Sequence, residues 1–188
     1  MSYLRTFAPW IVYALIAGDS VGSKRWGALA ALAVTVLVVV RQRMHGDNFD
    51  ALIIEIGSGI FFVGLVVLAV VAPGSALLGY SAALSSAALA VIAWGSLAIR
   101  RPFTLGIAKQ STPRELWAEP GFLRVNVIIT LVWAASFTLG AALLAVVAHA
   151  GGGVLPRTIV QVAAFVIPMV FTVRYAAAVR ARAGDAVS

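Results

Sequence analysis

Four long apolar segments with very few charges limit what this chain can fold into. They occupy residues 50–72, 76–99, 121–148 and 155–179, and each exceeds the about 20 helical residues that cross the roughly 30 Å hydrocarbon core of a bilayer. Hydrophobic residues make up 62% of the chain and charged residues 11%, against about 45–50% and about 25% in soluble domains. The sequence therefore predicts a polytopic membrane protein and excludes collagen-like, disordered and disulfide-stapled classes.

Two shorter apolar segments, residues 7–18 and 26–40, precede these four. The second is about 22 Å long as a helix, so it crosses only if the bilayer thins or if Lys24 and Arg25 extend outward. We expect an all-α bundle of about six transmembrane helices, at about residues 7–20, 24–42, 50–72, 76–99, 121–148 and 155–180. They form one domain over residues 1–182, with an interfacial loop at 100–120 and a flexible tail at 183–188. A shallow hairpin made by the first two segments is the alternative.

The cations are unevenly divided between the two ends of this predicted bundle. If the N-terminus is cytoplasmic, eleven cations lie on the cytoplasmic side and three, Lys24, Arg25 and Arg157, lie outside. The positive-inside rule then predicts cytoplasmic termini and a multi-pass protein of the bacterial inner membrane. The net charge of +7 is explained by topology and by anionic lipid headgroups, which are the expected partners, and nucleic acid is not expected.

The loop between the fourth and fifth predicted helices carries the densest group of cations. The candidate ligands for lipid headgroups are Arg100, Arg101, Lys109, Arg114 and Trp117. Thr112 and Glu115 have the spacing of a capping box, with Pro113 at the first helical position, which predicts a short helix at residues 113–118. The alternative role of the loop is topology and interfacial anchoring alone.

Several residues near the ends of the predicted helices form a pattern seen in a known family. They are Phe7-Ala8-Pro9, Arg101-Pro102-Phe103, Trp117, Asn126, Trp133 and Phe137. The pattern resembles the bacterial intracellular septation protein A family of small inner-membrane proteins. This resemblance implies a non-enzymatic role in envelope integrity, cell elongation or septation through membrane partners, and it supplies no catalytic residues.

Charged residues inside the apolar segments suggest a second kind of site. Glu55 lies about 7.5 Å below the cytoplasmic boundary and Arg174 about 9 Å below it, at 1.5 Å per helical residue. Because an isolated charge at such depth is costly, we predict a Glu55–Arg174 ion pair, with Asn126 as a candidate third member. The alternatives are an Arg174 side chain that reaches the interface and a protonated Glu55 beside Ser58 or Asn126. A polar site of this kind is the basis of an alternative function, a small transporter or channel.

A metal-dependent enzyme is a further alternative. Asp47 and Asp50 form an Asp-x-x-Asp pair, and Glu55 follows; a lipid-modifying enzyme could use such carboxylates to hold Mg²⁺ on a diphosphate. A second acidic motif is missing, so capping of a helix N-terminus is the favoured role of this pair. Cysteine is absent and the two histidines lie far apart, so neither a zinc site nor any cofactor is expected.

Helix packing is expected to depend on small residues, because there is no hydrophobic driving force between helices that are surrounded by lipid. Small residues recur every four positions at 27/31/35, 82/86/90 and 134/138/142, which favours close packing within the chain over a face for homo-oligomers. Pro168 should kink the last helix or relax its hydrogen bonds. Asp19 is predicted to form a local ion pair with Lys24 and Arg25.

Overall fold

The computed structural model describes residues 5–44, 52–110 and 112–185, and these ranges are helical apart from short connections. The predicted all-α fold is thereby confirmed. The elements are α2 (Ala8–Ile16), α3 (Val21–Met44), α4 (Ile53–Val71), η2 (Ala76–Tyr80), α5 (Ser81–Ala98), α6 (Phe103–Lys109), η3 (Arg114–Leu116), α7 (Pro120–His149) and α8 (Val154–Asp185). Within these described ranges, five segments are long and apolar enough to cross a membrane: α3, α4, η2 with α5, α7 and α8.

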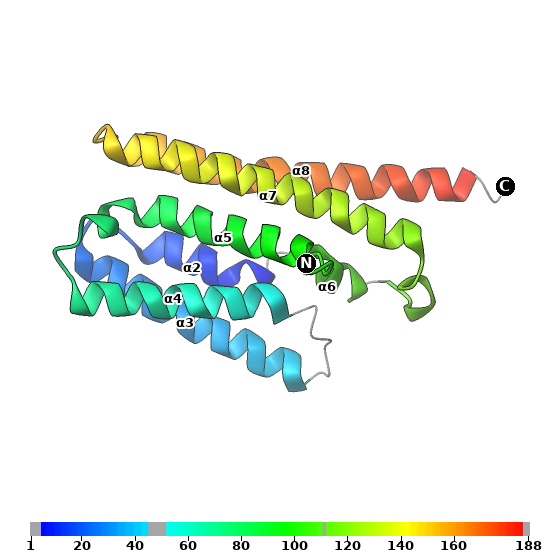
Figure 1. Cartoon of the computed structure of the whole chain (residues 1–188), viewed down its shortest axis with the longest axis horizontal. Coiled ribbons are helices and arrows are strands. Elements are labelled where there is room, and N and C mark those ends of the chain that lie inside the picture. Colours follow the sequence, from blue (N-terminus) through cyan, green and yellow to red (C-terminus); the bar gives the residue numbers. More distant parts are fainter. Residues whose placement is uncertain (1–4, 45–51, 111, 186–188) are drawn as a thin grey trace.

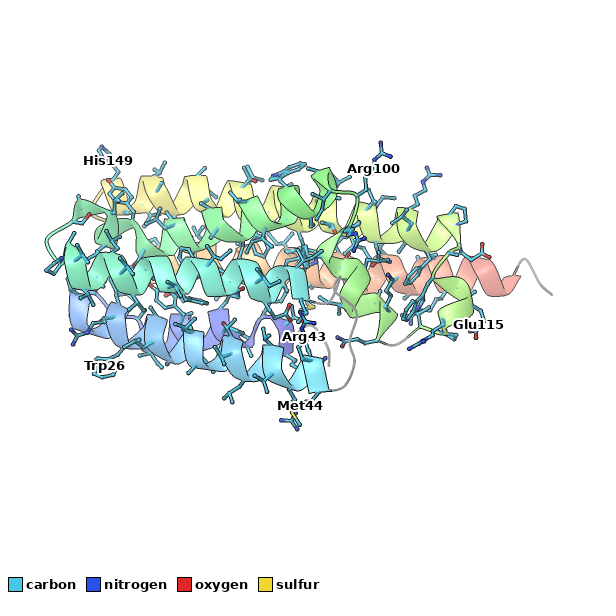
Figure 2. All side chains as sticks on the ribbon, turned by 60° about the horizontal axis from the view of Figure 1, so that its bottom comes forward. Trp26, Arg43, Met44, Arg100, Glu115 and His149 are labelled. Atoms are coloured by element: carbon cyan, nitrogen blue, oxygen red, sulfur yellow. The ribbon has the colours of Figure 1, made fainter. Side chains whose placement is uncertain are left out.

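The long helices run side by side between two ends of an elongated bundle (Figure 1). One end holds the connections at residues 17–20, 72–75 and 150–153, and we call it the Asp19 end. The other holds the connection from α5 to α7 and the C-terminal half of α8, and we call it the basic end. Figure 2 shows Trp26 and His149 at the Asp19 end, and Arg43, Arg100 and Glu115 toward the basic end. The predicted separation of the cations is therefore present in the fold.

The first two helices have different boundaries from those predicted. The regular helix α2 has nine residues, about 13.5 Å, so it is shorter than the helix predicted at about residues 7–20. Helix α3 has 24 residues and begins at Val21, earlier than predicted. The side chain of Ser20 accepts a hydrogen bond from the Ser23 amide at 3.0 Å, which is the geometry of an N-cap. This cap starts α3 early enough for it to span.

The N-terminal segment nevertheless connects both ends of the bundle. At the basic end, Arg5 Nη2 donates to Gln110 Oε1 at 2.9 Å. At the Asp19 end, Arg157 Nη1 lies 2.7 Å from Asp19 Oδ1. The described part of the chain therefore passes between the ends six times, five times as a helix of spanning length and once as the shorter segment that contains α2.

Aromatic rings from four parts of the chain form the centre of the bundle. Phe7 stacks on Trp133 with ring centroids 4.9 Å apart, and Phe103 lies edge-on to both rings at 6.3 Å. Phe137 and Phe165 close the group, with centroids 5.3 Å apart. Aromatic pairs of this geometry contribute about 0.5–1.5 kcal/mol each beyond their burial. Phe7 is therefore fixed by rings from α6, α7 and α8.

The small residues act within the chain where they meet another helix. Gly27, Ala31 and Thr35 are all buried on α3, and a Cβ added at Gly27 would lie 3.1 Å from the backbone nitrogen of Ala17. The predicted intramolecular role is confirmed for this stripe. The stripe of small residues on α7 has this packing role only in part, because Ala142 is exposed.

The loop at residues 100–120 is more deeply built into the bundle than predicted. Helix α6 was not anticipated, and its residues 103–107 are buried because Phe103 and Thr104 pack against α7. The predicted helix at 113–118 is wrong. A 3₁₀ turn, η3, occupies Arg114–Leu116, and it has no side-chain cap. The carbonyl of Thr112 instead accepts a hydrogen bond from Trp117 Nε1 at 3.0 Å.

Helix α8 packs mainly on α7 and continues to Asp185, beyond its predicted end. Pro168 lies inside it and has no N–H to donate to the carbonyl of Ala164. Ser136 of α7 supplies the missing donor, with Ser136 Oγ 3.0 Å from that carbonyl oxygen. A Cβ added at Gly140 would lie 2.9 Å from the Cβ of Ala164, so glycine permits this approach. The predicted relaxation of hydrogen bonding at Pro168 is confirmed.

Candidate functional site

Two of the predicted headgroup-binding cations lie beside one indole ring at the basic end. Lys109 Nζ lies 5.1 Å from the centroid of Trp117 and Arg114 Cζ lies 5.6 Å from it. These are distances at which a cation is attracted by the ring quadrupole. The hydrogen bond from Trp117 to Thr112 holds the indole in position. Lys109 and Arg114, two of the five predicted residues, thus lie against the ring of a third, Trp117.

Arg100 and Arg101 lie at the end of α5 with exposed side chains. The Arg100 amide donates to the carbonyl of Leu97 at 2.9 Å and the Arg101 amide donates to that of Ser96 at 2.8 Å. This pair of bonds places Arg100 in the left-handed conformation, with φ at 57°, as in a Schellman cap. The backbone therefore directs two consecutive guanidinium groups away from the helix end.

Glu55 has a different partner from the one predicted. Its side chain is 1% exposed, and Gln42 Nε2 of α3 donates to Glu55 Oε1 at 2.9 Å. One turn further along α4, Ser58 Oγ accepts a hydrogen bond from Trp10 Nε1 at 2.8 Å. The carboxyl group therefore belongs to the interface of α3 with α4. Gln42 was missed, although a glutamine that ends a long apolar segment between two arginines was the available signal.

The other two members of the predicted polar site lie elsewhere. Arg174 is exposed on α8, a helix that packs on α7, whereas α4 packs on α3 and α5. Asn126 is buried, and its Nδ2 donates to the carbonyl of Phe122 in its own helix at 2.9 Å. The backbone carbonyl of Asn126 accepts from Thr104 Oγ1 at 3.0 Å. The structure therefore uses Asn126 to dock α6 on α7 and does not bring Glu55, Asn126 and Arg174 together.

The carboxylates of the metal hypothesis are described only in part. Within residues 5–44, 52–110 and 112–185, no cluster of three or more histidine, aspartate or glutamate side chains is placed to hold a metal ion. Asp47 and Asp50 lie outside the described residues, so their roles as ligands or helix caps stay predictions.

The local ion pair predicted for Asp19 is wrong, and a long-range pair replaces it. The carboxylate pairs with Arg157 at the start of α8, at 2.7 Å, while Lys24 Nζ donates to the backbone carbonyl of Asp19 at 2.9 Å. Arg25 instead lies over Trp26. The hydrogen bond and the positive charge of Arg157 hold the pKa of Asp19 below its ordinary value. The sequence signal that linked Asp19 with Arg157 was that both residues are predicted to lie on the same side of the membrane.

The described polar residues thus serve two kinds of role. Those near Glu55 and Asn126 join neighbouring helices, whereas the exposed side chains of Arg100 and Arg114 at the basic end can meet anionic groups outside the bundle. A comparison of this chain with protein-family models, with curated proteins and with solved structures finds no match.

Proposed function

We propose that this chain is a non-enzymatic protein of the bacterial inner membrane that maintains the cell envelope or assists septation. It acts through anionic lipids and membrane partners that bind its basic end. The placement of Lys109 and Arg114 against Trp117, on the same loop as the exposed Arg100 and Arg101, is the observation that carries this proposal. Cations at this level attract anionic lipid by about 1 kcal/mol each, and an indole belongs at the headgroup level.

The aromatic core supports the same proposal. Phe7, Phe103, Trp133 and Phe137 belong to the pattern that resembles the septation protein A family, and their rings lie in one cluster. These residues come from the first segment, from α6 and from α7. The pattern is therefore compatible with a common way of packing α6 against the helices, which positions the cationic loop at the basic end.

The test compares a strain that lacks the protein with strains that carry defined variants. One variant neutralises the loop as R100Q/R101Q/K109Q/R114Q, and its matched control, R100K/R101K/K109R/R114K, keeps every charge. Cell length, spacing of septa and leakage of a periplasmic marker are measured in each strain. Co-purified phosphatidylglycerol and cardiolipin are quantified from the same membranes.

We expect the deletion to alter cell length or envelope leakage, the charge-preserving variant to restore both, and the neutral variant to restore neither. The neutral variant should also retain less anionic lipid. A deletion strain with normal septa and an intact envelope that has lost uptake of a solute would overturn the proposal in favour of a transporter. Equal lipid retention by the two loop variants would remove the proposed role of the basic end.

A further inference from the structure

A cavity of about 220 Å³ opens at the Asp19 end, among residues of α3, η2, α5, α7 and α8. Its polar wall comprises Asp19, Lys24, Tyr80 and Arg157, and its apolar wall comes from α5 and α7, with Ala83 and Leu144 among its residues. The cavity is smaller than the about 300–1,000 Å³ of sites for drug-sized ligands. It therefore fits a small ligand, or only the polar part of a larger one.

The polar wall carries more positive than negative charge. Lys24 is 6% exposed, and its ammonium group donates to the backbone carbonyl of Asp19. The carboxylate of Asp19 is engaged by Arg157. The pocket thus holds two cations and one carboxylate, and the carboxylate is bonded to Arg157, whereas the ammonium group of Lys24 is bonded to a neutral oxygen. Because a buried cation is costly unless an anion offsets it, the pocket favours a negatively charged ligand.

Both cations have hydrogen-bond donors to offer such a ligand. A lysine ammonium has three N–H donors and an arginine guanidinium has five, whereas Lys24 and Arg157 use one each on Asp19. Tyr80, at the rim, lies with its hydroxyl 3.4 Å from His149 Nδ1 and can also contribute a donor. A tetrahedral anion with several oxygens can accept hydrogen bonds from all of these groups at once.

We propose that this pocket binds a phosphate group, held by Lys24 and Arg157 beside the apolar wall. The phosphate can belong to a phospholipid headgroup or to free inorganic phosphate. Exposed apolar side chains at the same end, such as Leu77, Val146 and Leu155, give the acyl chains of a lipid a surface next to the pocket. The pocket lies at the end of the bundle opposite the cationic loop, so this site is separate from the proposed function.

The experiment uses the full-length protein with the loop neutralised as R100Q/R101Q/K109Q/R114Q, so that bound phosphate reports on the pocket. Native mass spectrometry measures phosphatidylglycerol that stays bound after transfer into a detergent free of phosphate. Binding of ³²P-labelled inorganic phosphate is measured in the same detergent. The tested variants are K24Q and R157Q, and the matched control is R25Q, which removes a neighbouring cation that does not line the pocket.

We expect K24Q and R157Q to weaken binding at least about tenfold, as loss of a charge-assisted hydrogen bond does, and R25Q to leave it unchanged. Retention of the lipid without binding of free phosphate assigns the site to a headgroup, and binding of both with mutual competition assigns it to phosphate in general. Absence of binding for both ligands overturns the proposal, as does a loss in R25Q equal to that in K24Q.

D19N gives a test with the opposite sign, which holds even if K24Q fails to fold. Removal of the carboxylate takes away the anion that competes with phosphate for Arg157, so D19N should bind phosphate several-fold more tightly. A decrease in affinity on D19N, with the fold intact by circular dichroism, would contradict a cationic phosphate site.

Discussion

Arg100 occupies a backbone conformation in which most proteins place glycine. Helix α7 ends with the same pair of bonds, from Gly151 to Ala148 and from Gly152 to Val147, and there the left-handed residue is Gly151, with φ at 65°. The side chain at position 100 therefore carries a strain that glycine avoids.

Arg100→Gly should therefore stabilise the fold by about 1 kcal/mol, since a left-handed conformation costs a residue with a Cβ about that much. Thermal unfolding in a mild detergent measures the change. Arg100→Ala is the control, because it removes the same charge and keeps the Cβ. If both variants shift the melting temperature equally, the effect comes from charge and the backbone is not strained.

The ion pair of Asp19 with Arg157 predicts a defined dependence on pH. The pKa of Asp19 is lowered in the folded protein, so the pair stabilises the fold above the ordinary pKa of about 3.9. This contribution is lost as the pH falls below that value toward the lowered pKa. D19N should thus melt below the wild type at pH 7, and the difference should shrink at pH 3. A difference that is constant across this range would show that the ion pair does not stabilise the fold.

At the level of helices, α7 and α8 are joined where Pro168 leaves the Ala164 carbonyl without its helical donor. Ser136→Ala should cost about 0.6 kcal/mol and up to about 1.7, the range of hydrogen bonds between membrane helices. Pro168→Ala restores an N–H, so in that background Ser136→Ala should cost less. Unfolding free energies of the four proteins in this cycle measure the coupling. Additive effects would mean that Ser136 does not replace the missing donor.

The contact of α3 with α4 depends on Glu55 and Gln42, and a second cycle tests it. Glu55→Ala and Gln42→Ala should each destabilise the protein, and their combination should cost less than the sum by roughly 0.5–3 kcal/mol. Arg174→Gln is the control, because its side chain is exposed on α8, and its effect should add to that of Glu55→Ala. Coupling of Glu55 with Arg174 and not with Gln42 would restore the ion pair predicted from depth alone.

At the scale of the whole molecule, the two ends differ in charge and are predicted to face opposite sides of the membrane. Reporter fusions after Gly74 and Gly152 should appear outside, and a fusion after Gln110 should appear in the cytoplasm. The physical reason is the cost of moving cation-rich loops across the membrane. Alkaline phosphatase and fluorescent-protein fusions together measure this. A cytoplasmic signal at both Gly74 and Gly152 would reverse the orientation.

The sequence alone determined the class of the molecule, because hydropathy depends on composition along the chain and needs no knowledge of contacts. The four long segments, the all-α fold and the separation of the cations follow from it. Pro168 was also interpreted correctly, since a missing N–H is a local property. The boundaries of α2 and α3 depended on a capping hydrogen bond at Ser20. The sequence signal of this cap is weaker than the apolar pattern of the neighbouring segments.

The tertiary structure decided which polar groups meet. Depth in the membrane gave Glu55 and Arg174 the same level, but it carries no information on the angular position of a helix or on which helices are neighbours. Because α4 packs beside α3 and α8 packs beside α7, Glu55 accepts a hydrogen bond from Gln42 and Arg174 is exposed. The same order brings Arg157 to Asp19 across 138 positions and creates the pocket beside Lys24. Contacts between distant segments arise from the packing of whole helices, and the identity of single residues does not reveal them.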